Sequence, residues 1–118
     1  MLRMAALGVV LAMIALPARA EFSKIEDRET FVGIVRDRTL SRPMVSLEVS
    51  PAGQISGRGA VWDVTGEWNW QNGYFCRDLV WGGDSLGYDC QRVEVRRDGR
   101  IRFISDRGRG QMAEFTLR

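Results

Sequence analysis

The spacing of apolar residues divides the chain into a short helical part and a long part made of strands. Over residues 27–36 the apolar side chains fall on one face of a helix, with Phe31 and Val35 one turn apart. Asp27 precedes them and belongs to the residue types that cap helix N-termini, so the pattern predicts one helix there. From residue 39 onward apolar and polar residues alternate, which is typical of strands that bury one face.

Turn signals interrupt the alternating part at short intervals. They are Pro51-Ala52-Gly53, Asn72-Gly73, Gly82-Gly83-Asp84, Asp98-Gly99 and the glycine-rich stretch at residues 108–110. The segments between them predict about seven strands, at residues 44–50, 55–64, 67–71, 74–81, 86–95, 100–105 and 112–117. Such strands indicate an antiparallel meander forming a small closed or nearly closed barrel, with the helix over one open end or the edge. A sandwich of two sheets is the alternative.

Residues 1–20 have a different pattern, in which one charged residue precedes an uninterrupted apolar run. Arg3 lies before the run, Pro17 ends it, and Ala18-Arg19-Ala20 has the small residues of a signal peptidase site. The run is shorter than the roughly 20 apolar residues of a membrane span, although an uncleaved anchor is the alternative. We therefore expect a signal peptide over residues 1–20 and one mature domain over residues 21–118. The domain is expected in the periplasm or outside the cell, with no membrane span after cleavage.

The two cysteines fall opposite each other when residues 82–84 are counted as a three-residue turn. That register pairs Trp81 with Ser85 and, further along the same hairpin, Cys76 with Cys90. Opposite residues of an antiparallel pair lie within reach of a disulfide, and an exported chain permits one. A redox-active pair is the alternative, but it would need C-x-x-C spacing or a neighbouring histidine. The sequence therefore predicts a structural disulfide.

One face of the predicted sheet gathers most of the aromatic residues. Because side chains alternate across a strand, this face carries Trp68, Trp70, Phe75, Arg77, Leu79, Trp81, Asp89, Gln91, Val93 and Val95. Arg77 and Asp89 lie opposite each other on it, so they are predicted to form a core ion pair or to anchor a ligand. A buried pair would make Asp89→Asn more costly than reduction of the disulfide. The aromatic residues either fill the barrel or line a pocket for one small ligand.

Composition narrows the possible functions. The chain has 17 Lys+Arg and 15 Asp+Glu, and because Arg3 and Arg19 lie in the expected leader, the mature domain is formally neutral. A neutral domain lacks the basic surface typical of nucleic-acid binders. The chain has no His, which excludes Ser-His-Asp and Cys-His catalysis, and it has no dinucleotide, P-loop or EF-hand motif. We expect no metal and no cofactor. Scattered carboxylates leave a paired acid–base site as a minor alternative.

The segment Asp106-Arg107-Gly108-Arg109-Gly110 is the most distinctive turn. The simplest interpretation is a hairpin turn. Its backbone amides could bind an anion. It could also enter an enzyme cleft, as the loops of small lysozyme-inhibiting barrels do. The loop is therefore a candidate interaction site.

Four segments resemble a family of small exported proteins of alphaproteobacteria. They are Trp62–Trp70, Asn72–Arg77, Asp89–Gln91 and Ile101–Gly108, and the resemblance covers essentially the whole predicted mature chain. Members of this family often carry the name dihydrodipicolinate reductase. Such a reductase is similar to other nucleotide-dependent dehydrogenases and needs a glycine fingerprint and a His/Lys catalytic pair. This chain has no His and one Lys, so no catalytic residue is transferred to it.

These observations together favour a binding function over catalysis. The sequence predicts a non-catalytic periplasmic or secreted module that binds a small ligand or an envelope protein. The first alternative is an envelope inhibitor or stress protein of the lysozyme-inhibitor type. The second is an enzyme with the activity that the family name implies.

Overall fold

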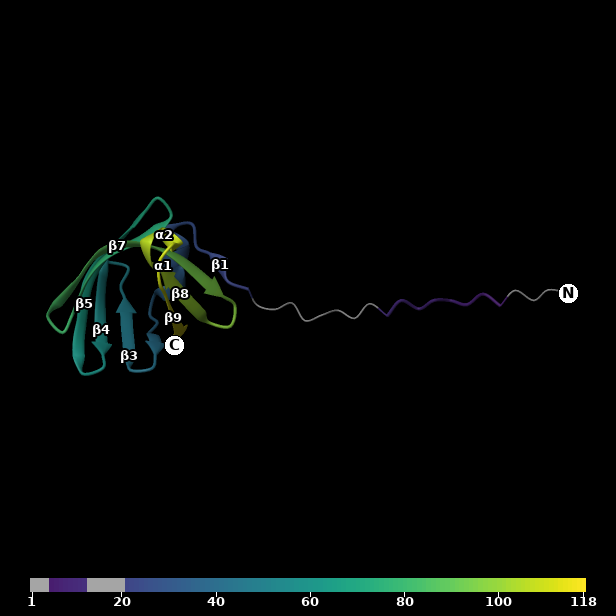
Figure 1. Ribbon diagram of the computed structural model, residues 1–118, viewed down its shortest axis with the longest axis horizontal. Helices are drawn as coiled ribbons and strands as arrows, with labels where there is room; N and C mark the ends of the chain where they lie inside the picture. Colours follow the sequence, from purple (N-terminus) through teal and green to yellow (C-terminus); the bar gives the residue numbers. More distant parts are fainter. Residues whose placement is uncertain (1–4, 13–20) are drawn as a thin grey trace.

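Eight antiparallel strands close into a barrel in the computed structural model, which describes residues 5–12 and 21–118 (Figure 1). The strands are β1 (Ser23–Lys24), β2 (Leu40–Arg42), β3 (Val45–Val49), β4 (Gln54–Gly59), β5 (Trp62–Gln71), β6 (Tyr74–Trp81), β7 (Asp84–Arg96), β8 (Arg100–Ile104) and β9 (Met112–Leu117), and the helices are α1 (Arg28–Val35) and α2 (Ser105–Gly108). From β2 to β9 each strand pairs with the next, and β9 returns to pair with β2. The predicted barrel is therefore confirmed, and the two-sheet alternative is wrong.

Strand β1 lies outside the ring of eight. It pairs with the end of β7, where Lys24 lies opposite Glu94. The first half of β7 pairs with β6 and its second half pairs with β8. β1 therefore lies beside the second half of β7, on the side where β6 has already ended.

The predicted helix forms, and it closes one end of the barrel. The Asp27 carboxylate accepts the backbone N–H of Thr30 at 3.1 Å and the Thr30 hydroxyl at 2.8 Å, which caps α1 as expected. Phe31 and Val35 are fully buried. In Figure 1, α1 and the turns that join β2 to β3 and β4 to β5 lie at opposite ends of the barrel.

The disulfide between Cys76 and Cys90 is present, with the two Cα atoms 3.9 Å apart. The register that aligns these residues differs in detail from the prediction. The turn has two residues and pairs Trp81 with Asp84, and an irregularity between Leu79 and Val80 then shifts the register by one. The turn is one residue shorter than predicted, and the shift in register by one residue cancels this difference. Cys76 and Cys90 are therefore still paired.

Two turns were missed because non-glycine residues adopt left-handed backbone conformations there. Ala60 has a φ of 54° and Met44 has a φ of 65°. The Ala60 N–H donates to the Met44 carbonyl at 2.7 Å, which ties the two turns together. The predicted strand 55–64 is therefore wrong: the chain reverses between β4 and β5, and β5 runs on without a break into the predicted strand 67–71.

Residues 5–12 form neither helix nor strand, and the apolar side chains of Leu7, Val9, Val10 and Leu11 are exposed. Neither helix of the described chain has the length and apolar character to cross a membrane. The expected cleavage site at Ala18-Arg19-Ala20 lies outside the described residues. The signal peptide and the periplasmic or secreted location therefore stay predictions.

Candidate functional site

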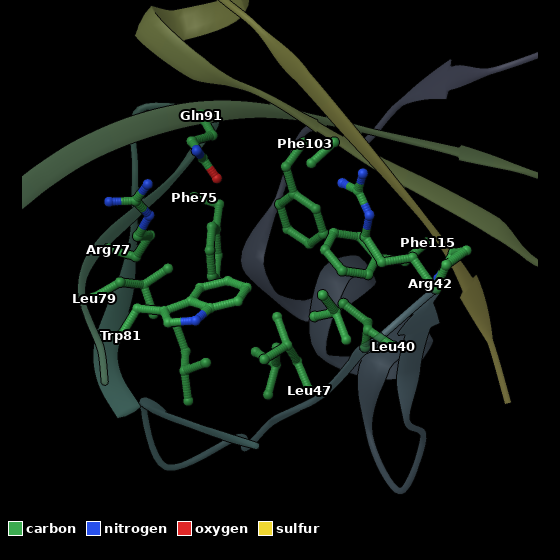
Figure 2. Close-up of a pocket in the computed structure, with 15 residues that line it drawn as sticks. Leu40, Arg42, Leu47, Phe75, Arg77, Leu79, Trp81, Gln91, Phe103 and Phe115 are labelled. Atoms are coloured by element: carbon green, nitrogen blue, oxygen red, sulfur yellow. The ribbon is translucent and has the colours of Figure 1, made fainter. Parts of the chain in front are cut away.

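The barrel interior is filled near α1 and hollow toward the other end. The hollow part is a cavity of about 420 Å³ that opens toward the rim, by which we mean the turns joining β2 to β3, β4 to β5 and β6 to β7 (Figure 2). The cavity is lined by Leu40, Arg42, Pro43, Val45, Leu47, Val49, Ile55, Phe75, Arg77, Leu79, Trp81, Gln91, Phe103, Ala113 and Phe115. Twelve of these fifteen side chains are apolar. The aromatic residues therefore fill the barrel near α1 and line a cavity toward the other end.

The aromatic cluster below α1 forms the floor of the cavity. The Phe31 ring lies 5.2 Å from Trp68, 5.1 Å from Trp70 and 5.1 Å from Phe75, measured between centroids. The Trp68 indole donates to the Ser50 carbonyl at 2.9 Å, so its buried N–H has a partner. Two of the predicted aromatic residues, Trp68 and Trp70, therefore belong to the packed core, while Phe75 reaches both the core and the cavity.

Trp81 is the large aromatic wall of the cavity near the rim. Its indole lies against the backbone of Gly59, where an added Cβ would come within 1.8 Å of the ring. Any other residue at position 59 would displace the indole. Gly59 thus provides space for a cavity-lining side chain.

Arg77 and Asp89 are opposite each other in the register, as predicted, but the predicted ion pair is wrong. Within residues 21–118 their charged groups form no salt bridge with each other. Arg77 donates from Nη1 to the Gly87 carbonyl at 2.8 Å. The Asp89 carboxylate accepts the Gln91 side-chain amide at 3.0 Å and the backbone N–H of Asp106 at 3.1 Å. The two side chains share an inward face, but each has its own partners.

Burial and the nearby negative charges shift the pKa of Arg77 in opposite directions. Partial burial of the guanidinium lowers the pKa of Arg77, and the charges of Asp89 and Asp78 partly offset this effect. Arginine nevertheless stays protonated at neutral pH. The cavity wall therefore carries a positive charge in a partly desolvated place.

A second arginine, Arg42, lines the cavity from the opposite wall, and the sequence analysis missed it. Its guanidinium lies 5.7 Å from the centroid of the Phe115 ring. Figure 2 shows Arg42 and Arg77 on opposite sides, with the rings of Trp81 and Phe115 between them. Arg42 was missed because the three-residue strand β2 was not predicted, although Leu40 and Arg42 alternate with a polar residue.

The loop at residues 106–110 is a left-handed turn rather than a simple hairpin turn. Asp106 and Arg107 have φ values of 50° and 54°. The Asp106 N–H is bound by Asp89, and Gly110 lies so close to Ser105 that a Cβ would come within 2.1 Å of the Ser105 Oγ. The loop is thus held against the barrel, and its role as an interaction site stays a prediction.

Two carboxylates meet on the outer surface rather than in the cavity. Glu67 and Asp78 are paired across β5 and β6, both are exposed, and they line a shallow depression with Tyr88. Directly opposed like charges of this kind are unfavourable. Within the described residues, no group of three or more His, Cys, Asp or Glu side chains is arranged to hold a metal ion.

No family model, curated protein or solved structure matches this chain. The resemblance to the exported alphaproteobacterial family therefore stays a prediction.

Proposed function

We propose that this protein is a non-catalytic binding protein whose barrel holds one small, mainly apolar ligand. The cavity carries the proposal: its volume of about 420 Å³ lies within the roughly 300–1,000 Å³ of small-molecule sites. Its apolar lining would exchange water for a ligand favourably, at about 25 cal/mol per Å² of apolar surface buried. Two arginines and Gln91 supply the few polar groups that such sites use to orient a ligand.

The fold holds this cavity open before a ligand binds. Helix α1 fixes the floor through Phe31, and the Cys76–Cys90 disulfide joins the two strands that carry Arg77 and Gln91. A preformed site avoids much of the entropy cost of ordering on binding. A disulfide also fits an oxidising compartment, which supports the proposed periplasmic or secreted location.

The rim supports entry of an apolar ligand. Met44, Val61 and Trp62 are large apolar residues at the rim, and they are 76%, 71% and 53% exposed. The turns of the rim contact one another. The Ala60 N–H donates to the Met44 carbonyl, and the backbone of Gly82 lies against the Trp62 ring. An apolar border at the mouth would favour transfer of an apolar molecule into the cavity.

Titration with the apolar dye N-phenyl-naphthylamine tests the proposal. We expect saturable one-to-one binding with a blue shift in dye emission. Leu47→Trp should fill the cavity and weaken binding at least tenfold. Ser46→Trp is the matched control, because Ser46 is the exposed outward neighbour on β3. Ala113→Leu fills the cavity more gently if Leu47→Trp unfolds the barrel. Absence of saturable binding to the wild-type protein would overturn the proposal.

A further inference from the structure

We infer that the ligand is an anionic amphiphile, with an apolar tail in the cavity and an anionic head held by Arg77 and Arg42. This inference rests on the proposed function and adds the charge and shape of the ligand.

The arginines that lie in strands differ in whether they have a carboxylate partner. Seven strand residues are arginines, and five of them have a carboxylate partner within residues 21–118. The pairs are Arg58–Asp63, Arg92–Glu94, Arg96–Asp98, Arg100–Glu114 and Arg102–Glu94. The two strand arginines without such a partner are Arg42 and Arg77, and these are the two that line the cavity. Among the strand arginines of residues 21–118, a carboxylate partner is thus missing only at the two that line the cavity.

The carboxylate placed to neutralise Arg77 binds other groups. Asp89 faces Arg77 in the register, but its two oxygens accept hydrogen bonds from the Gln91 side chain and the Asp106 backbone N–H instead. The Gly87 carbonyl takes one donor of Arg77, and a guanidinium has five. Donors therefore remain for a ligand, and the nearest acid is engaged elsewhere.

The side chains of the cavity wall carry a net positive charge. Among the fifteen lining residues two are arginines and none is an aspartate or glutamate. Burial already disfavours the charged form of Arg77, since desolvation lowers its pKa. An anion in the cavity would replace the lost hydration with charge-assisted hydrogen bonds. A cationic ligand would instead add a third positive charge.

The geometry also indicates how the ligand lies. The apolar side chains of Leu40, Val49 and Ile55 line the cavity toward α1, whereas Arg42 comes from the last residue of β2, beside the rim. Arg77 lies deeper, opposite Trp68 and four residues before the rim end of β6, so a head between the two arginines and a tail among the apolar side chains would satisfy both regions. A planar carboxylate suits a guanidinium because two parallel N–H···O bonds can form, and sulfate or phosphate heads offer similar oxygens.

Four ligands with the same tail and different heads separate charge from apolar burial. They are decanoate, decyl sulfate, decanol and decyltrimethylammonium, each used below its micelle concentration in displacement of the dye. We expect both anions to bind at least tenfold more tightly than decanol, and the cation to bind most weakly. Decanol binding as tightly as decanoate would overturn the anionic head but leave the apolar cavity intact. Failure of all four to displace a dye that itself binds saturably would overturn the amphiphile, whereas the proposed function is overturned only if the dye does not bind.

Substitutions then assign the charge to residues. Arg77→Gln should weaken decanoate binding about tenfold and leave decanol unchanged. Arg42→Gln should have a smaller effect, about threefold, because Arg42 is exposed. Arg97→Gln, in the exposed turn between β7 and β8, is the matched control and should change neither. Circular dichroism checks folding, and the uncharged Arg77→Met, with the same expected result, replaces Arg77→Gln if the latter does not fold. Unchanged decanoate affinity in the Arg42→Gln/Arg77→Gln double variant would overturn the assignment.

Discussion

Arg77 and Asp89 lie directly opposite each other on β6 and β7, yet their charged groups bind different partners. The guanidinium donates to the Gly87 carbonyl, and the carboxylate accepts Gln91 and the backbone of Asp106. Asp89 thereby connects β7 to the left-handed loop that follows β8. Arg77 is left beside the cavity with a charge that no carboxylate contacts within residues 21–118.

This arrangement predicts that Asp89→Asn destabilises the protein less than reduction of the disulfide does. An asparagine keeps one oxygen acceptor, so the loss should be about 1 kcal/mol, the size of one hydrogen bond. A disulfide that closes a loop of about 15 residues contributes roughly 3 kcal/mol. The order is the reverse of the one expected from a buried ion pair.

Urea unfolding of the wild type, its reduced form and Asp89→Asn measures these free energies. Asp84→Asn, at an exposed aspartate of the same strand, is the control and should be neutral. A loss at Asp89→Asn larger than the loss on reduction would show that Asp89 interacts with Arg77 more strongly than their separate partners indicate.

The second prediction concerns Glu94, the buried acid on the outer face of β7. Glu94 is 7% exposed, and its carboxylate accepts hydrogen bonds from Nε of Arg92 at 3.0 Å and from Nε of Arg102 at 2.5 Å. Strand β1 pairs beside it, and Arg102 also stacks on Phe22 at 3.9 Å. Glu94→Gln removes the charge shared by both arginines and should lower the free energy of unfolding by about 2–3 kcal/mol.

Chemical denaturation of Glu94→Gln measures this loss. The control is Glu48→Gln, an exposed position on β3, which should change stability little. Hydrogen exchange should also accelerate at the backbone amides of β1, because its contact surface on β7 changes. Equal stability of the two variants would contradict the central role of Glu94.

The third prediction is a pH dependence at the start of α1. Hydrogen bonds from the Thr30 side chain and then its backbone N–H lower the pKa of Asp27 below the ordinary value of 3.8. The folded-state pKa lies below the unfolded one, so the carboxylate stabilises α1 above the unfolded value. This stabilisation is lost as pH falls through the lowered folded value.

Asp27→Asn provides the comparison, since asparagine caps a helix without titrating. The stability of the wild type relative to Asp27→Asn should be constant near neutral pH and should decrease as the pH is lowered below 3.8. Unfolding curves at a series of pH values measure the difference. A difference that does not change with pH would show that the Asp27 charge contributes nothing to the cap.

The sequence predicts the architecture better than the details of the turns. The helix was predictable because Asp27 caps it and Phe31 lies on its apolar face. The two missed turns depend on left-handed conformations at Ala60 and Met44, for which neither residue type has a preference. Tertiary contacts between these turns stabilise them, and local sequence carries no sign of such contacts.

The candidate site was predictable in part. Strand alternation placed Phe75, Arg77 and Trp81 on the inward face, and all three line the cavity. The rotamers of Arg77 and Asp89 were not predictable, because the competing acceptor is the Gly87 carbonyl, beside the register shift, and one competing donor is a backbone N–H of the loop after β8. The size of the cavity was not predictable either, since it depends on how deeply α1 inserts Phe31.

The last prediction uses the contact between Gly59 and Trp81. A Cβ at position 59 would come within 1.8 Å of the indole, so Gly59→Ala should displace the ring, reduce dye affinity several-fold and cost about 1–3 kcal/mol of stability. The double variant Gly59→Ala/Trp81→Phe should recover dye binding, because the smaller ring leaves room for the methyl group. Gly33→Ala is the control: it faces open space in α1 and should stabilise the helix by roughly 0.5–1 kcal/mol without changing dye affinity. If Gly59→Ala binds the dye as the wild type does, Trp81 does not form part of the binding surface.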